Sequence, residues 1–223
     1  FPTRRSSDLV PLLARSFPDA IVVDEYDTSA CTEADCEASY EQLALYFGKD
    51  GDEIYRSFVP LIPPPNSTER TPKGIGISWF SVNTRKSLPP LEDWANVLRT
   101  LDCPIQSLQY DELGAGLSTL VDLAQKEIHP SLPIDQMVDI DGFAGQISNV
   151  AGVLTISNTT AHMAGALGVK CVVLLDDEQH LSWPAKGNFS PFFPNLRLVR
   201  QEGRPWEHVV RQGLSLLHCG TKR

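Results

Sequence analysis

Two polar segments in the second half of the sequence follow apolar runs and carry residue types that bind anions. The segment 80–86 reads FSVNTRK and contains hydroxyl groups, an amide and two adjacent cations, Arg85 and Lys86. The segment 157–162 reads SNTTAH and continues into the small-residue stretch AGALG. Cationic side chains and the free N–H groups at the start of a helix both stabilise phosphate. For each segment taken alone, a solvated or capped turn without a ligand explains the residues equally well.

A third polar segment, 176–190, follows the apolar run CVVLL and reads DDEQHLSWPAKGNFS. Its acidic residues and His180 suggest a metal at first sight. Their spacing fits no standard zinc pattern, so we favour a solvated loop and predict no metal site. Trp183 and the FFP sequence at 192–194 are aromatic for a surface loop. We expect them to pack on the core or to flank a base or sugar.

The common short signatures of catalysis are absent from the sequence. It contains no G-x-G-x-x-G, no Walker loop, no G-x-S-x-G and no H-E-x-x-H. No order of Ser, His, Asp or Cys suggests a nucleophile with its base. The residues alone therefore identify two possible anion sites and no general base.

The scaffold for these segments is predicted by alternating apolar runs and helical stripes. Runs such as CVVLL are apolar without alternation, which indicates strands covered on both faces. The pattern predicts an α/β fold, a Rossmann-like open parallel sheet with helices on both faces, whose ligands bind at the carboxyl ends of the strands. Strands are expected at 74–79, 105–110, 137–140, 153–156, 170–175 and 196–199, and helices at 91–101, 117–128, 142–150, 159–167 and from 205 onward.

The first 73 residues follow a different pattern. Residues 1–9, FPTRRSSDL, match a translated sequencing-library adapter at every position, so we expect them not to belong to the natural protein. Residues 10–58 follow, with a short helical or loop piece at 10–17, a strand at 20–23 and an amphipathic helix at 37–47. Residues 59–73 contain five prolines and are expected to be a linker between domains.

Composition excludes some classes of protein. The chain has 223 residues, a formal net charge of −9 and 42% hydrophobic residues. It has no apolar run approaching the roughly 18–20 residues of a membrane span, and its acidic balance argues against nucleic acid as a partner. None of its five cysteines forms a Cys-x-x-Cys pair, which is typical of reduced thiols in a cytoplasmic protein.

Read in order, four stretches of the sequence resemble one family of enzymes. They are GISWFSVNTRKSLPPLEDW, IQSLQYDE, VAGVLTISNTTAHMAGALGVKCVVLLDDEQHLSWP and SPFFPNLRLVRQ. Together they resemble the C-terminal half of bacterial GT-B glycosyltransferases of the family 9 or heptosyltransferase type. Such domains often follow tetratricopeptide repeats and are similar to the catalytic half of O-linked N-acetylglucosamine transferase. The resemblance covers about residues 74–212.

The resemblance implies a domain organisation and roles for particular residues. Residues 74–223 would hold a nucleotide-diphosphate sugar without a cofactor or a required metal, and 10–58 would be the remnant of the N-terminal acceptor domain. The residues implied to bind the donor diphosphate are Ser81, Arg85, Lys86, Asn158, Thr159, Thr160 and His162. Those expected near the donor sugar or base are Ser157, Asp176 and Trp183. Many relatives have Asp at the position of Ser157.

The function implied for the parent protein is glycosyl transfer by direct displacement at the anomeric carbon. The partners would be a nucleotide-sugar donor, a glycan, lipid or protein acceptor, and the chain's own N-terminal domain. Because the catalytic base of such enzymes lies in that N-terminal half, we expect this chain to be inactive alone. Two alternatives stay open: an enzyme similar to nucleotide-sugar epimerases, and a non-catalytic binding module decayed from a transferase.

Overall fold

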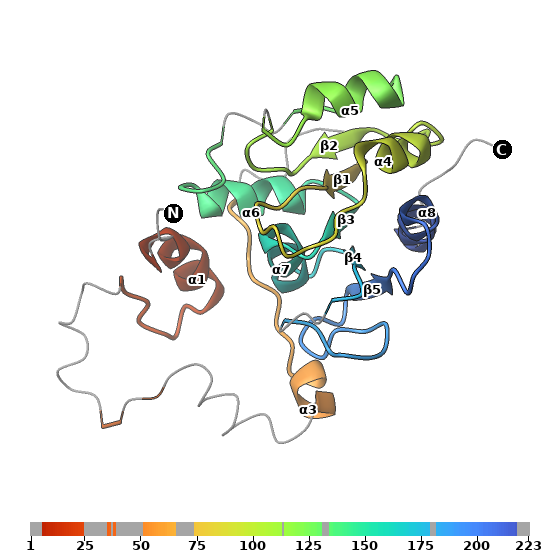
Figure 1. The fold of residues 1–223 in the computed structure, drawn as a ribbon. Helices are drawn as coiled ribbons and strands as arrows, with labels where there is room; N and C mark the ends of the chain where they lie inside the picture. The colour runs from red at the N-terminus through yellow and green to blue at the C-terminus, as the bar shows by residue number, and fades with distance from the viewer. Residues whose placement is uncertain are drawn as a thin grey trace.

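The centre of the molecule is a five-stranded parallel sheet (Figure 1). The computed structural model describes residues 6–24, 35–36, 38, 51–65, 74–112, 114–130, 134–178 and 182–217. The strands are β1 (Ile75–Ser78), β2 (Ile105–Ser107), β3 (Gly152–Ile156), β4 (Cys171–Leu175) and β5 (Leu196–Arg200), in the order β2-β1-β3-β4-β5. The chain runs outward from β1 to β2 and then crosses back to β3. The strand order therefore reverses between β1 and β3, where open α/β sheets bind their ligands.

Helices cover both faces of the sheet. One buried cluster joins it to α4 (Leu91–Leu98), α5 (Leu117–Ala124) and α8 (Trp206–Leu217). A second joins the other face to α1 (Val10–Ser16), α6 (Ile140–Ser148) and α7 (Thr159–Ala166). The described residues also form a 3-10 helix, η1 (Ser6–Leu9), and a short helix, α3 (Gly51–Arg56). The predicted α/β Rossmann-like fold is confirmed.

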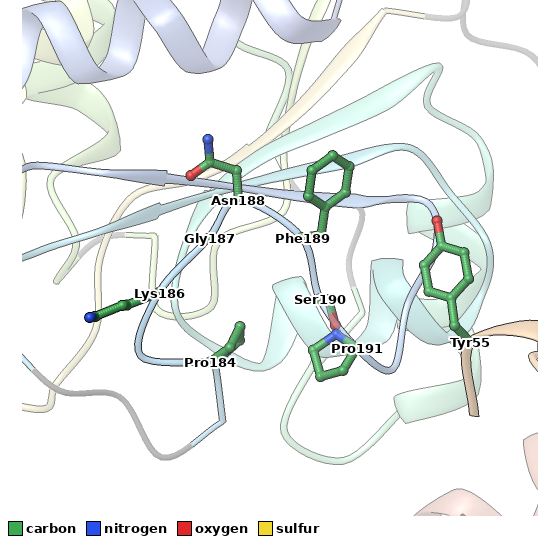
Figure 2. A pocket seen from close by; sticks show the side chains of 8 residues that line it. All are labelled: Tyr55, Pro184, Lys186, Gly187, Asn188, Phe189, Ser190 and Pro191. Carbon is green, nitrogen blue, oxygen red and sulfur yellow. The ribbon is translucent and has the colours of Figure 1, made fainter. Parts of the chain in front are cut away.

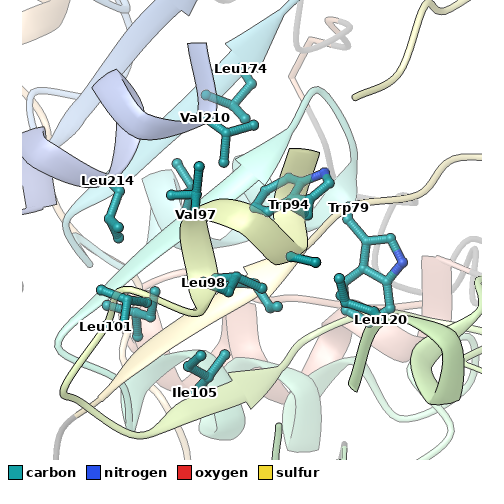
Figure 3. Packing of buried hydrophobic residues seen from close by; sticks show 14 of the residues in the cluster. Trp79, Trp94, Val97, Leu98, Leu101, Ile105, Leu120, Leu174, Val210 and Leu214 are labelled. Atoms are coloured by element: carbon teal, nitrogen blue, oxygen red, sulfur yellow. The ribbon is translucent and has the colours of Figure 1, made fainter. Parts of the chain in front are cut away.

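Successive side chains of the central strands point to opposite faces of the sheet, and apolar residues on both faces form the two-sided core. Every residue of β3 and of β4 is buried, as the run CVVLL predicts. Leu154 and Leu174 belong to the cluster shared with α4 and α8, whereas Val153 and Val173 belong to the opposite one. Figure 3 shows the α4 side of the first cluster, where Trp94 and its neighbours pack toward the residues of α8. This burial fixes the register of the strands and hence the positions of the loops at their carboxyl ends.

Two predicted strands are wrong. Residues 20–23 form no strand, and Ile21 is 85% exposed. Its β-branched neighbours favour a strand only where a partner strand is available. Residues 137–140 form a turn that enters α6, because the Asp139 carboxylate caps that helix by accepting a hydrogen bond from Gly142 N at 2.7 Å.

Three predictions for the first part of the chain remain untested. The helix expected at 37–47 lies outside the described residues, apart from residue 38. The adapter origin of residues 1–9 and the division at the proline-rich segment 59–73 also stay predictions.

The described N-terminal residues pack against the α6 and α7 side of the sheet. Leu12 of α1 is fully buried in the cluster on that face. Arg15 forms an ion pair with Asp141 of α6, in which its Nη1 lies 3.2 Å from Oδ2. Further along, Leu61 N donates a hydrogen bond of 2.8 Å to Ala166 O at the end of α7. Leu12 of α1 and the sheet therefore share one hydrophobic cluster.

Shortening Leu12 should destabilise the whole sheet domain. We expect Leu12→Ala to lower the free energy of unfolding by about 2–4 kcal/mol, because it leaves a cavity between α1 and the core. Phe17→Ala is the control, since that side chain is 42% exposed, and it should cost less than about 1 kcal/mol. Urea denaturation followed by circular dichroism measures both. Equal losses would show that α1 does not share the core of the sheet.

Candidate functional site

The carboxyl ends of β1, β3 and β4 bring the three polar segments to one edge of the sheet. The loop at 79–90 leaves β1, residues 157–158 connect β3 to α7, and Asp176 follows β4. Because β1 and β3 are neighbours at the point where the strand order reverses, their loops lie where open α/β sheets bind ligands, a place that we call the crevice. The two anion-binding segments suggested by the sequence thus face each other.

Asn158 organises the start of α7. Its Oδ1 accepts a hydrogen bond from Ala161 N at 3.3 Å and one from Thr155 Oγ1 at 3.1 Å. The hydroxyl of Thr160 is buried and donates to Leu108 O at 3.4 Å, so it ties the helix to the end of β2. The N-terminal end of α7 carries a partial positive charge from its aligned peptide dipoles. It can therefore contribute to binding an anion at the crevice.

A chain of hydrogen bonds joins Asn158 to the ends of two further strands. Asn158 Nδ2 donates to Ser78 Oγ at 2.8 Å, and Ser78 Oγ donates to Gln109 Oε1 at 3.0 Å. Gln109 Oε1 also accepts from the backbone N–H groups of Trp79 and Phe80, both at 2.9 Å. Gln109 is 1% exposed. We call these contacts the Gln109–Ser78–Asn158 chain, and they set the direction in which the loop leaves β1.

Gln109 and Ser78 are site residues that the sequence pattern does not reveal. Both lie within predicted strands, where a polar residue next to apolar ones is the one signal of their role. Their partners in this hydrogen-bond chain are distant in the sequence, since Ser78 and Gln109 are 31 positions apart and Ser78 and Asn158 are 80 positions apart. No local pattern could have paired them.

Lys86 is held against the end of β3 by its own ammonium group and by Asp176. Lys86 Nζ donates a hydrogen bond to Ser157 O. Burial lowers the pKa of Lys86 below its usual value, while the negative charge of Asp176 acts in the opposite direction. Asp176 is 4% exposed and accepts from Ser87 N at 2.7 Å and from Glu178 N at 3.3 Å. The expected solvated loop is therefore wrong at Asp176, because its carboxylate anchors the loop that carries Lys86.

His162 and Trp183 form a stacked pair beside Ser157. Their ring centroids are 4.8 Å apart with an interplanar angle of 6°, and the Phe193 ring lies at 69° to that of His162 with a centroid distance of 6.4 Å. Trp183 Nε1 donates to Ser157 Oγ at 2.9 Å. Burial, followed by the positive charge of Lys86, lowers the pKa of His162. Both effects favour the neutral form of the imidazole.

The contacts thus bring together five of the residues suggested by the sequence, and Asn158 directly follows one of them, Ser157. These six, which we call the crevice cluster, are Lys86, Ser157, Asn158, His162, Asp176 and Trp183. Three others take no part in the contacts just described. Arg85 is exposed, Thr159 is half-buried, and Ser81 Oγ accepts from Asn83 N at 3.3 Å within its own loop.

A separate cavity of about 410 Å³ lies beside the loop between β4 and β5. Figure 2 shows Tyr55 of α3 next to the loop residues that line it, among them Lys186 and Phe189. No member of the crevice cluster lines it.

Among the described residues, no three His, Cys, Asp or Glu side chains gather as metal ligands. Within those same ranges, every helix is too short or too polar to cross a bilayer.

Comparison with known proteins supports the fold. No family model matches the chain. It is 27% identical over 142 residues to protein FlbA of Caulobacter vibrioides, a match that covers 61% of this chain and 23% of FlbA. The ADP-heptose lipopolysaccharide heptosyltransferase II of E. coli superposes with a TM-score of 0.54 at 12% identity, over 71% of this chain and 53% of that one. A family 9 glycosyl transferase from Veillonella parvula gives 0.52 at 13% identity, over 74% and 48%.

The two solved structures share their fold with this chain, which spans about half the length of each. That fold is the Rossmann-like α/β arrangement expected for one half of a GT-B enzyme. At 12% and 13% identity, the likeness describes the backbone and leaves the chemistry to be argued from the residues.

Replacing Gln109 should destabilise the protein more than any change of side-chain volume explains. Gln109→Met keeps the length of the side chain but leaves the N–H groups of Trp79 and Phe80 without their acceptor. We expect a loss of about 2–4 kcal/mol in the free energy of unfolding, because unpaired buried polar groups are costly. Gln212→Met is the control, since the side chain of that exposed residue accepts a hydrogen bond from Arg204 at the surface. Thermal and urea unfolding of both variants should differ by at least about 1 kcal/mol, and equal stabilities would contradict this role.

Proposed function

We propose that this chain contributes the nucleotide-diphosphate-sugar site of a glycosyltransferase, located in the crevice between β1 and β3. The observation that carries the proposal is the position of Lys86 beside the N-terminal end of α7, at the reversal of the strand order. A cation and a helix start are the two features that bind phosphate without a metal. The match to two transferase folds supports the same function.

Lys86 has hydrogen-bonding capacity left for a ligand. An ammonium group has three N–H donors, and one of them bonds Ser157 O. The remaining donors suit the oxygens of a diphosphate. Burial lowers the pKa of Lys86, so an anion bound at the crevice would raise that pKa again. By the same linkage, the charged form of Lys86 would bind the anion more tightly than the neutral form.

The proposed reaction is displacement of the nucleoside diphosphate from the anomeric carbon of the sugar by an acceptor hydroxyl. The bond from the anomeric carbon to the diphosphate oxygen breaks, the bond to the acceptor oxygen forms, and the acceptor proton passes to a base. Lys86 and the N–H groups of α7 would stabilise the charge that develops on the leaving diphosphate. We assign the base and the acceptor site to an N-terminal domain, since the chain spans about half of the transferases it matches.

The donor class follows from the same resemblance. The E. coli enzyme is described as acting with ADP-heptose, so a nucleoside-diphosphate heptose or hexose is our first candidate for this chain. The acceptor, whether glycan, lipid or protein, is not specified by the crevice cluster. The proposal also includes a cytoplasmic location, where nucleotide sugars are available as substrates.

Removing the charge of Lys86 should abolish most of the nucleotide affinity. Isothermal titration of the chain with ADP, UDP and GDP and with their hexose derivatives should detect binding by at least one of them. Lys86→Gln should weaken it by at least about tenfold, because a charge-assisted hydrogen bond to phosphate is lost. Lys170→Gln is the matched control, since Lys170 is exposed and directly precedes β4, at the opposite edge of the sheet. Binding by none of these ligands, or equal losses in both variants, would refute the donor site.

Nucleotide binding should not require a divalent metal. We expect the nucleotide affinity measured with excess EDTA to equal the affinity measured with added Mg²⁺ within about twofold, because Lys86 and α7 supply the positive charge. The two titrations use the same protein and ligand, so they differ only in the ion. A gain of about tenfold or more with Mg²⁺ would show that the crevice needs the cation.

A further inference from the structure

Trp183 contacts both ends of the segment that starts α7. Its ring stacks on His162, the last residue of SNTTAH, and its Nε1 donates to the Oγ of Ser157, the first. Trp183 is 5% exposed and Ser157 is 8% exposed. One side chain from the loop after β4 therefore contacts both the residue that follows β3 and the first turn of α7.

We propose that Trp183 is a positioning residue of the donor site, which holds the His162 ring and the Ser157 hydroxyl in the orientation that receives the nucleotide sugar. This inference rests on the proposed function. Trp183 acts through its two neighbours, because its one N–H donor is already used on Ser157 and its ring face is covered by His162.

The stack restricts what His162 can do. The two imidazole nitrogens form hydrogen bonds in the plane of their own ring. Stacking on Trp183, with the rings parallel to within 6°, fixes that plane. The Phe193 ring, at a centroid distance of 6.4 Å and an angle of 69°, limits movement of the His162 ring further. The neutral ring presents one N–H donor and one acceptor. A fixed plane therefore gives His162 a defined donor direction before any ligand arrives.

The surroundings of His162 determine how its titration would report on Trp183. The loop after β1 brings Lys86, whose positive charge acts on His162, and the end of β4 brings Asp176, whose charge acts on Lys86. On α6, which packs against α7, the charged Asp141 is paired with Arg15. Trp183 and Phe193 carry no charge and contribute by covering the ring. Because burial is the larger cause of the lowered pKa of His162, uncovering the ring should raise that pKa.

Two replacements of Trp183 separate the stack from the hydrogen bond. Trp183→Phe keeps an aromatic ring over His162 and removes the N–H, whereas Trp183→Leu removes both. Phe192→Leu is the control from the same loop, since Phe192 is 49% exposed. Two quantities are measured on the full chain: the pKa of His162, from the pH titration of its ring protons by NMR with the signal assigned by His162→Gln, and the dissociation constant of the tightest nucleotide.

In Trp183→Leu we expect the pKa of His162 to rise toward its ordinary value of 6.5. Nucleotide affinity should then fall by about tenfold or more. In Trp183→Phe the pKa should stay low, while affinity falls by about threefold to tenfold because the bond to Ser157 is lost. The double variant Trp183→Phe, Ser157→Ala should lose no more affinity than the more affected of the two single variants. The reason is that both single variants and the double variant remove the same hydrogen bond.

Each contrary result has a distinct meaning. If the wild-type chain binds nucleotide but Trp183→Leu binds it equally well, Trp183 does not position the site. Additive losses in the double variant would likewise overturn the role of the indole N–H. If the wild-type chain binds none of the nucleotides, the proposed function fails and the inference fails with it. The pKa of His162 in the ligand-free protein is measured in every case. An unchanged pKa in Trp183→Leu would contradict the claim that Trp183 covers the His162 ring.

Discussion

The candidate site depends on the Gln109–Ser78–Asn158 chain. These three side chains join the carboxyl ends of β2, β1 and β3, so they cross the point where the strand order reverses. A buried polar group costs free energy unless it has a hydrogen-bond partner. Each of these three side chains therefore depends on the other two. The loop that bears Lys86 begins at two backbone N–H groups bound to Gln109. These contacts between protein groups therefore fix the ends of the three strands and the start of that loop.

The charges around the crevice favour an anion despite the net charge of −9 for the chain. Lys86 is partly desolvated, and its lowered pKa shows that its environment gains from a negative partner. Asp176 supplies some of that negative charge, yet its oxygens also accept from Ser87 N and Glu178 N, which fixes the loop. Burial and the charge of Lys86 favour the neutral form of His162, so Lys86 is the main source of positive charge in the crevice cluster. An arrangement in which one lysine and one helix start provide the positive potential is consistent with chemistry that needs no metal.

Much of the fold was predictable, because hydrophobic periodicity decides the elements and their burial. The βα units from β1 onward, the two-sided core and the position of two anion segments at one edge all follow from runs such as CVVLL. The strand expected at 20–23 failed, since β-branched residues without a neighbouring strand have nothing to pair with. The contacts that build the site were also out of reach: Trp183 bonds Ser157 across 26 positions, and no local pattern encodes such a pair.

The most direct test of the account is a crystal structure of the chain with the nucleoside diphosphate it binds most tightly. The account predicts the diphosphate between β1 and β3, with its oxygens within hydrogen-bonding distance of Lys86 Nζ and of the N–H groups that begin α7. The His162 ring should remain stacked on Trp183. A nucleotide found instead in the cavity lined by Tyr55 and Phe189, with Lys86 still bonded only to the protein, would contradict it.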